Sequence, residues 1–251
     1  MSNNSKIGIV ILAAGLGKRM KSDLPKVMHL LSGKPLIDWV VSCAEKINEE
    51  KRIVIVVSPK HTLVQEYIKN RAEYVIQDEP KGTGHAVSCA APLLQGNVEK
   101  VVVLNSDVPL VSHESLEQLL KEQETTNSVI SLLTTNFPDF ENWRLGLLSF
   151  GRILRDENGV IEEIREYKDC DEEQKQIKEL NAGQYCFDAD WLFENLPLLN
   201  TQNVQGELYL TDLIKIALKS GKKVASVSIE PKQAIGISTP EDLQLAQQFV
   251  V

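Results

Sequence analysis

The stretch Ile7-Gly-Ile-Val-Ile-Leu-Ala-Ala-Gly15-Leu-Gly17-Lys18-Arg19-Met20 decides the fold class. Its first part, Ile7–Leu12, is an apolar, β-branched run without polar alternation, which is typical of a strand buried on both faces. The following Leu12–Met20 segment is rich in small residues, so its backbone N–H groups can closely approach anionic oxygens. It is neither a dinucleotide fingerprint, which needs a third glycine where Met20 stands, nor a P-loop, which ends in Gly-Lys-Ser/Thr. The stretch predicts a strand leading into a phosphate-binding loop.

Short apolar runs alternate with helical patterns through the rest of the first half. Buried strands are predicted at Ile53–Val57 and Val101–Leu104, and helices at Pro35–Ile47, His61–Asn70, His85–Leu94 and Ser115–Glu124. This repetition implies right-handed crossovers and a ligand site at the carboxyl ends of the strands. We therefore expect a Rossmann-like α/β fold, with a mixed, mostly parallel sheet flanked by helices.

The second half is less regular. We expect strands at Ser128–Thr134, Leu180–Phe187 and Val224–Ile229, a hairpin within Arg152–Lys168, and helices at Leu208–Lys219 and from Thr239 onward. An aromatic insertion occupies residues 136–150. No low-complexity linker or internal repeat divides the chain, so we expect one α/β domain whose second half forms a substrate-binding lobe.

Composition excludes several classes of function. The chain has 251 residues and a formal net charge of −8, which disfavours nucleic acid as a partner. No apolar run approaches the roughly 20 residues that span a bilayer, so we expect no membrane partner. The cysteines are widely spaced, which favours reduced thiols in a cytoplasmic protein: Cys43, Cys89, Cys170 and Cys186.

Three segments could carry chemistry. Between Gly15 and Pro35 the chain has five basic residues and one acid, which favours a polyphosphate site over a solvated basic face. Gly82-Thr83-Gly84 precedes a helix, where free N–H groups either meet a ligand or are simply capped. Asp107 ends a buried strand, a position suited to a divalent ion or to a turn before Pro109.

These segments together resemble the nucleotide-diphospho-sugar transferases, and most closely the uridylyltransferase domain of N-acetylglucosamine-1-phosphate uridylyltransferases. The similarity is carried, in order along the chain, by LAAGLGKRM at 12–20, SDLPKVMHLLSGKP at 22–35, QDEPKGTGHA at 77–86, SDVPLV at 106–111, GRILRDENG at 151–159, EYKDCDEEQKQIKELNAG at 166–183 and QGELYLTD at 205–212. The resemblance implies a nucleotide-binding half at about 1–127 and a sugar-binding half at about 128–251. Because the resemblance covers the uridylyltransferase half alone, we expect no acetyltransferase β-helix domain within these residues.

The resemblance also implies roles for individual residues. Leu12, Ala13, Ala14 and Gly15 would contact the nucleotide, Arg19 and Lys26 would act as catalytic cations on phosphates, and Gln77, Gly82 and Thr83 would surround the base. Gln77 could pair with uracil or with cytosine. Asn105 would lie beside the ligand, Asp107 would bind Mg²⁺, and Gly151, Glu166 and Asn181 would contact the amino sugar.

The chain departs from the family pattern at three places. Asn105-Ser106 replaces the usual Tyr-Gly before Asp107, and Phe150 stands in a usual Tyr position after an insertion. Ser238 aligns with the family's second metal ligand, an Asn, and is expected to bind Mg²⁺ loosely through water or to cap the final helix. These departures bear on the sugar and the metal more than on the reaction.

The resemblance implies transfer of UMP from UTP to N-acetylglucosamine 1-phosphate, giving UDP-N-acetylglucosamine and pyrophosphate. Alternatives are a different sugar 1-phosphate or nucleotide, a catalytically silent nucleotide-sugar-binding module, and a glycosyltransferase that uses a preformed nucleotide sugar. The sequence lacks a clear nucleophile–base pair, which nucleotidyl transfer does not require, because the attacking phosphate oxygen is already ionised near pH 7.

Overall fold

The computed structural model describes residues 6–15, 17–47, 51–60 and 62–250. Its strands are β1 (Ile7–Ala13), β2 (Leu30–Leu31), β3 (Lys34–Pro35), β4 (Lys51–Val57), β5 (Glu73–Ile76), β6 (Lys100–Asn105), β7 (Ile130–Asn136), β8 (Arg152–Arg155), β9 (Ile161–Arg165), β10 (Glu179–Asp188) and β11 (Val224–Ser228). Its helices are α1 (Leu36–Ala44), α2 (Leu63–Ile68), α3 (Thr83–Ser88), α4 (Ala91–Leu94), α5 (His113–Thr126), α6 (Ala189–Asn195), α7 (Asp212–Lys219) and α8 (Pro240–Gln247).

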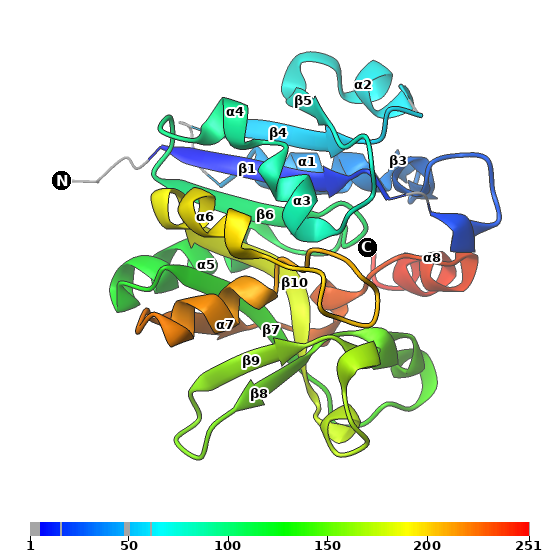
Figure 1. The fold of residues 1–251 in the computed structure, drawn as a ribbon. Coiled ribbons are helices and arrows are strands. Elements are labelled where there is room, and N and C mark those ends of the chain that lie inside the picture. The colour runs from blue at the N-terminus through cyan, green and yellow to red at the C-terminus, as the bar shows by residue number, and fades with distance from the viewer. Residues whose placement is uncertain (1–5, 16, 48–50, 61, 251) are drawn as a thin grey trace.

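One sheet runs through the molecule in the order β11-β7-β10-β6-β1-β4-β5 (Figure 1). The pairs β1–β4, β1–β6, β4–β5 and β7–β11 are parallel, whereas β10 is antiparallel to both β6 and β7. The hairpin β8–β9 joins the sheet through a single register pair, Leu180 with Arg152. The expected Rossmann-like, mostly parallel mixed sheet is confirmed.

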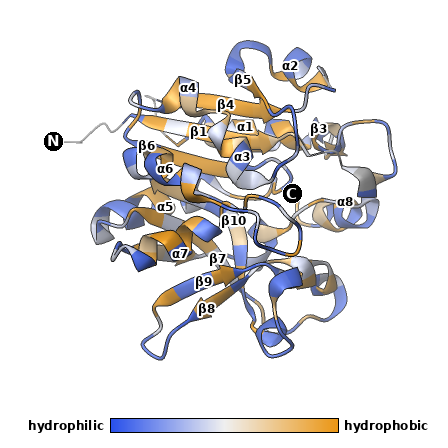
Figure 2. Ribbon diagram, viewed as in Figure 1, coloured by the Kyte–Doolittle hydropathy of each residue, from blue (hydrophilic) through white to orange (hydrophobic). Residues whose placement is uncertain are grey.

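The central strands are apolar on both sides because helices cover both faces of the sheet (Figure 2). On β1, Ile9 and Ile11 pack with α1, α2 and α5, whereas Val10 faces the layer of α3, α4, α6 and α7. All three side chains are fully buried. Burial on both faces explains why no polar residue interrupts the strand pattern.

Two predicted helices differ from the structure. The expected helix His85–Leu94 is two short helices, α3 and α4, because Pro92 in the first turn of α4 has no N–H to continue the preceding one. The expected helix from Leu208 begins only at Asp212. The residues before Asp212 form hydrogen bonds outside the helix instead: the N–H of Leu208 donates to the carbonyl of Lys81 at 2.8 Å. His61, the expected start of another helix, lies outside the described residues.

The insertion at 136–150 packs against the last residues of the chain. Trp143 packs against Phe137 with ring centroids 6.1 Å apart, and against Phe249 at 5.5 Å. Helix α8 is closed at its start by a capping box between Thr239 and Asp242. The insertion and α8 thus form one wall beside the carboxyl ends of β1 and β6 (Figure 1). Within the described residues, no helix is long and apolar enough to cross a membrane.

Candidate functional site

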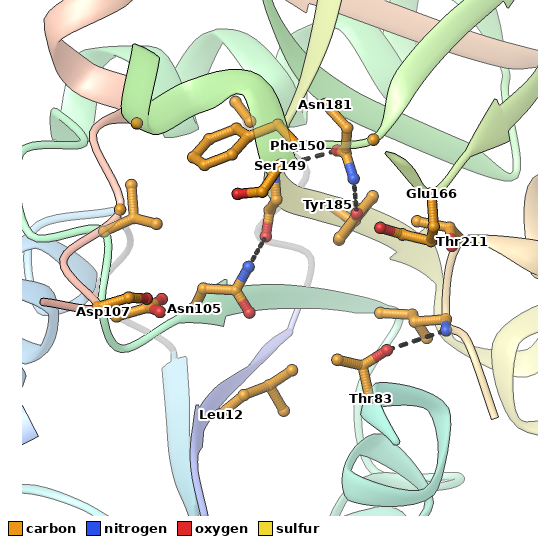
Figure 3. Close-up of a pocket in the computed structure, with 18 of the residues that line it drawn as sticks. Leu12, Thr83, Asn105, Asp107, Ser149, Phe150, Glu166, Asn181, Tyr185 and Thr211 are labelled. Atoms are coloured by element: carbon orange, nitrogen blue, oxygen red, sulfur yellow. Dashed lines mark hydrogen bonds between the residues drawn. The ribbon is translucent and has the colours of Figure 1, made fainter. Parts of the chain in front are cut away.

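Two adjoining cavities open at the carboxyl ends of β1 and β6, where the parallel arrangement predicted a ligand site. The loop cavity lies against the turn after β1. The lobe cavity, shown in Figure 3, reaches toward the β8–β9 hairpin and β10. Both cavities are lined by Leu12, Thr83, Asn105 and Asp107. A ligand with two chemically different ends could therefore extend from one cavity to the other.

The structure brings together nearly all of the predicted site residues. Besides the four shared residues, the loop cavity is lined by Ala14, Gly15, Lys26, Gln77 and Gly82, and the lobe cavity by Arg19, Gly151, Glu166, Asn181 and Ser238. The exception is Ala13, which lines neither cavity. Its side chain packs into the core on the face of the sheet that α1, α2 and α5 cover.

An ion pair stands where the two cavities meet. The Nζ atom of Lys26 lies 2.5 Å from Oδ2 of Asp107, and both side chains are mostly buried. Gly17 lets the loop approach Lys26, because its φ is +60° and a Cβ there would lie 2.6 Å from the Cβ of Lys26. Arg19 is exposed at the rim of the lobe cavity. Asp107 is thus paired with one cation, Lys26, and a second cation, Arg19, lines the lobe cavity with it.

The amide of Gln77 is oriented by its neighbours. Its Nε2 donates to the Gly82 carbonyl at 3.1 Å and lies 3.2 Å from Nδ1 of His85. Because a carbonyl only accepts, the facing atom is nitrogen, and Oε1 is the atom left for a ligand. An acceptor oxygen can pair with N3–H of uracil or with the amino group of cytosine, so the orientation of Gln77 alone does not distinguish the two bases.

The Gly82-Thr83-Gly84 turn is held by the segment before α7. The Thr83 hydroxyl accepts from the N–H of Leu210 at 3.0 Å, and Gly84 N–H donates to the Leu208 carbonyl at 2.8 Å. Gly82 has a φ of +105°, and a Cβ there would lie 2.6 Å from the Leu208 carbonyl oxygen. This close approach explains why the turn needs glycine.

The strand β6 ends in two contacts that fix its last residues. The Ser106 hydroxyl donates to the Leu12 carbonyl at 2.5 Å, which ties β6 to the end of β1. Nδ2 of Asn105 donates to the Gly183 carbonyl at 3.0 Å. Gly183 has a φ of +81°, and a Cβ there would collide with the Asn105 amide. Asn105 and Ser106 thus hold the end of β6 against β10 and β1.

Glu166 provides the most perturbed carboxylate in the lobe cavity. Burial raises the pKa of its carboxyl group, and the nearby charges of Asp169, Asp212 and Glu207 raise it further. A hydrogen bond from the Thr211 hydroxyl to Oε1, 3.1 Å long, partly opposes this effect on the pKa. Glu166 thus accepts from Thr211 through Oε1 in a poorly hydrated site.

The oxygen donors around Asp107 fit a magnesium ion. The backbone carbonyl of Asp107 accepts from Ile237 N–H at 2.8 Å, which brings the following Ser238 beside it in the wall of the lobe cavity. Thr239, and not Ser238, supplies the side-chain cap of α8. Asp242 lines the same cavity, but its Oδ2 accepts from the N–H groups of Ser238 and Thr239.

The Asp107 carboxylate, which here pairs with Lys26, and the neighbouring Ser238 hydroxyl suit Mg²⁺, which commonly takes one or two protein oxygens together with water and substrate phosphates. In the described part of the chain, no group of three or more His, Cys, Asp or Glu side chains could hold a metal by itself.

Some cavity residues were not predicted. Tyr185, Thr211, Ser149 and Asp242 all line the lobe cavity. Tyr185 lies four residues after Asn181 on β10, but a register irregularity separates the two residues. The even spacing that places residues on one side of a regular strand therefore does not predict its position. Ser149 and Asp242 come from the insertion and α8, whose approach to the site depends on tertiary packing.

Known proteins resemble the chain along nearly its full length. Residues 9–149 match the family model described as a MobA-like NTP transferase domain. Bifunctional protein GlmU of Desulfotalea psychrophila is 38% identical over 249 residues, which cover 99% of this chain and 71% of that protein. GlmU of Clostridium botulinum strain 657 and of Enterococcus faecalis are each 37% identical, over 95% and 96% of this chain.

The chain spans about half the length of the latter two GlmU proteins, 50% and 51% respectively. The matches include the glycine-rich loop after β1, for which phosphate binding was predicted, and the acidic end of β6, which line one cavity in the structure. The chain therefore belongs to the MobA-like NTP transferase domain family, and within it to the sugar-1-phosphate nucleotidyltransferases related to GlmU.

Proposed function

We propose that this chain transfers UMP from UTP to N-acetylglucosamine 1-phosphate, with Mg²⁺, and releases pyrophosphate. The observation that carries the proposal is the junction of the two cavities at Lys26 and Asp107. A nucleotide in the loop cavity and a sugar phosphate in the lobe cavity would bring their phosphates together there. The GlmU relatives support the choice of substrates.

The reaction needs positioning and charge more than a base. A phosphate oxygen of the sugar phosphate attacks the α-phosphorus, a new P–O bond forms, and the bond from the α-phosphorus to the β-phosphate bridge oxygen breaks. The attacking oxygen is already ionised near pH 7. Lys26 and Arg19 would hold the phosphates and offset the charge that builds up around the α-phosphorus. Bound Mg²⁺ would add Lewis-acid stabilisation of the phosphate oxygens.

The two cavities would supply the specificity. Leu12, Ala14, Gly15 and Gln77 line the loop cavity and would bind the nucleotide. Glu166 and Asn181 line the other side and would bind the sugar. Gly151 also lines this side, where a Cβ would lie only 3.1 Å from the side chain of Ile164.

A pyrophosphate-release assay with four nucleoside triphosphates, each combined with several sugar 1-phosphates, tests the proposal. We expect release only with UTP and N-acetylglucosamine 1-phosphate together. Release with another specific pair would replace the proposed substrates within the same reaction class. If no pair gives release but UDP-N-acetylglucosamine binds, the chain is a binding module.

The metal proposal has its own test. Asp107→Asn should largely abolish turnover, because the stabilisation by the metal is worth several kcal/mol. Ser238→Asn should lower the Mg²⁺ concentration needed for half-maximal rate, because an amide carbonyl is a better direct ligand than a hydroxyl. Direct Mn²⁺ binding, followed by electron paramagnetic resonance, should fall with Asp107→Asn and tighten with Ser238→Asn. A half-saturating concentration that stays constant or rises with Ser238→Asn would remove Ser238 from the metal site.

A further inference from the structure

A directed chain of hydrogen bonds crosses the lobe cavity from β6 to β10 (Figure 3). Nδ2 of Asn105 donates to the carbonyl of Gly183 at 3.0 Å. The N–H of Gly183 donates to Oδ1 of Asn181 at 3.0 Å, and Nδ2 of Asn181 donates to the Tyr185 hydroxyl oxygen at 2.6 Å. The direction of the links from Gly183 to Tyr185 can be worked out, because a backbone N–H group has only one role.

The backbone supplies the fixed point. The Gly183 N–H can only donate, so the Asn181 atom that faces it must be the oxygen. The atom of Asn181 that faces Tyr185 is then the nitrogen, which can also only donate. Tyr185 must therefore accept with its hydroxyl oxygen, and its own hydrogen remains available.

That hydrogen is in a site where it needs a partner. The Tyr185 side chain is only 5% exposed, and its ring packs against Phe187 with centroids 5.8 Å apart. Burial raises the pKa of the hydroxyl, so the phenol stays neutral and keeps its proton near pH 7. Among the described residues, the hydroxyl has only the hydrogen bond from Asn181. A buried donor without a partner is costly, and a bound ligand could relieve this cost.

The neighbouring group is an acceptor. Glu166 lines the same cavity as Tyr185, and its negative charge contributes to the raised pKa of the phenol. The site thus offers a carboxylate that takes a donor and, near it, a phenol that gives one. An acylamino group matches this pair, because it carries its N–H donor and its carbonyl acceptor on different atoms. A protonated amine offers donors alone and leaves the phenol unpaired.

We propose that Tyr185 is a specificity-determining residue, whose hydroxyl donates to the carbonyl oxygen of an acylamino substituent on the sugar phosphate. This inference rests on the proposed function. Asn181 is the group that sets the direction of the donor. A site that is built to pair with a polar group discriminates against a substrate that lacks it.

The test compares N-acetylglucosamine 1-phosphate with glucosamine 1-phosphate in one enzyme preparation. Because both rates come from the same sample, their ratio is independent of the folded fraction. In Tyr185→Phe, kcat/KM for the acetylated substrate should fall about tenfold, the effect of losing one hydrogen bond, while that for the amine stays nearly constant. Calorimetry with UDP-N-acetylglucosamine should show a similar loss of affinity without turnover.

A second variant tests the direction of the chain. Asn181→Asp keeps an acceptor for Gly183 but turns the Tyr185 hydroxyl toward a new acceptor oxygen. It should therefore reduce the preference for the acetylated substrate as Tyr185→Phe does, although the phenol is still present. Tyr74→Phe is the control, because the Tyr74 hydroxyl donates to the Lys69 carbonyl away from both cavities.

The outcomes separate this inference from the proposed function. If the wild-type chain does not use N-acetylglucosamine 1-phosphate, the proposed function fails. If the wild-type chain uses it, but Tyr185→Phe lowers both rates equally or leaves the ratio unchanged, the role of Tyr185 is overturned. A preference that persists in Asn181→Asp would overturn the direction of the hydrogen-bond chain.

Discussion

Glu166 shows how a single residue of the site affects the stability of the protein. Its carboxyl pKa is raised above the ordinary value of 4.5, mainly by burial. The stability that this residue contributes is fully present below its unfolded pKa and is lost as pH rises through the higher folded pKa. Glu166→Gln, which never ionises, should therefore be more stable than wild type at pH 8 and lose this advantage near pH 4.

Urea unfolding of both proteins at several pH values measures this difference. Glu162→Gln is the matched control, because Glu162 is an exposed carboxylate on the same part of the hairpin. It should show no comparable dependence on pH. Equal stability of wild type and Glu166→Gln at pH 8 would contradict the raised pKa. Glu166→Gln should also use the sugar phosphate poorly, because it replaces an acceptor oxygen with a donor nitrogen.

At the scale of elements, Arg152 holds the insertion against the hairpin. Its side chain is fully buried, and its guanidinium donates to the carbonyls of Leu148, Phe150 and Lys175. The ring centroids of Phe140 and Tyr167 each lie 5.0 Å from the guanidinium carbon of Arg152. Because Phe150 and the adjacent Ser149 line the lobe cavity, this cation positions one wall of the site.

Arg152→Met should destabilise the chain by about 3 kcal/mol or more, because it leaves several buried carbonyls unpaired. It should also raise the KM for the sugar phosphate more than it changes the binding of UTP. Arg155→Met on the same hairpin is the control: Arg155 is partly exposed and pairs with Glu179, so about 1 kcal/mol or less is expected. Urea unfolding and KM measurements check both variants, and equal destabilisation would contradict the special role of Arg152.

The elements also show how far the sequence could predict this molecule. The buried strands β1, β4 and β6 were predicted because burial on both faces leaves an unbroken apolar run. The edge strand β5 was not predicted, since its residues Glu73–Ile76 are largely exposed and lack such a pattern. Leu208–Leu210 resembled a helix start, yet tertiary hydrogen bonds to the Gly82–Gly84 turn hold it in another conformation.

The same limit applies to the site. Residues that follow directly from a strand, such as Asp107, could be placed at the sheet edge by the rule for parallel strands. The Asn181–Tyr185 contact depends on a register irregularity in β10 between these two residues, which no pattern of apolar residues indicates. Ser149 and Asp242 reach the cavity only because the aromatic insertion packs against the end of the chain.

At the scale of the whole molecule, the two predicted halves share one sheet. Strand β10 of the second half lies between β6 of the first half and β7, and Tyr185 pairs with Val103 across that boundary. Neither half can complete its hydrogen bonds or cover its apolar strand faces without the other. We therefore propose that residues 1–127 and 128–251 are one folding unit, although chains longer than about 150 residues often unfold through intermediates.

Tryptophan fluorescence can report from both halves, because Trp39 lies in the first half, where it packs against a cluster that includes Ile235 and Ile237, and Trp143 and Trp191 lie in the second. Variants that keep only Trp39 or only Trp191, with the other tryptophans replaced by phenylalanine, should each unfold in urea with the same midpoint by fluorescence and by far-ultraviolet circular dichroism. Coincident transitions are expected because breaking the β6–β10 pairing exposes both cores at once. The halves would be independent units if the fluorescence midpoints of the Trp39 variant and the Trp191 variant differ and circular dichroism shows two corresponding steps. The junction of the two cavities would then lie between two separately stable parts, and nucleotide binding alone would stabilise only the Trp39 transition.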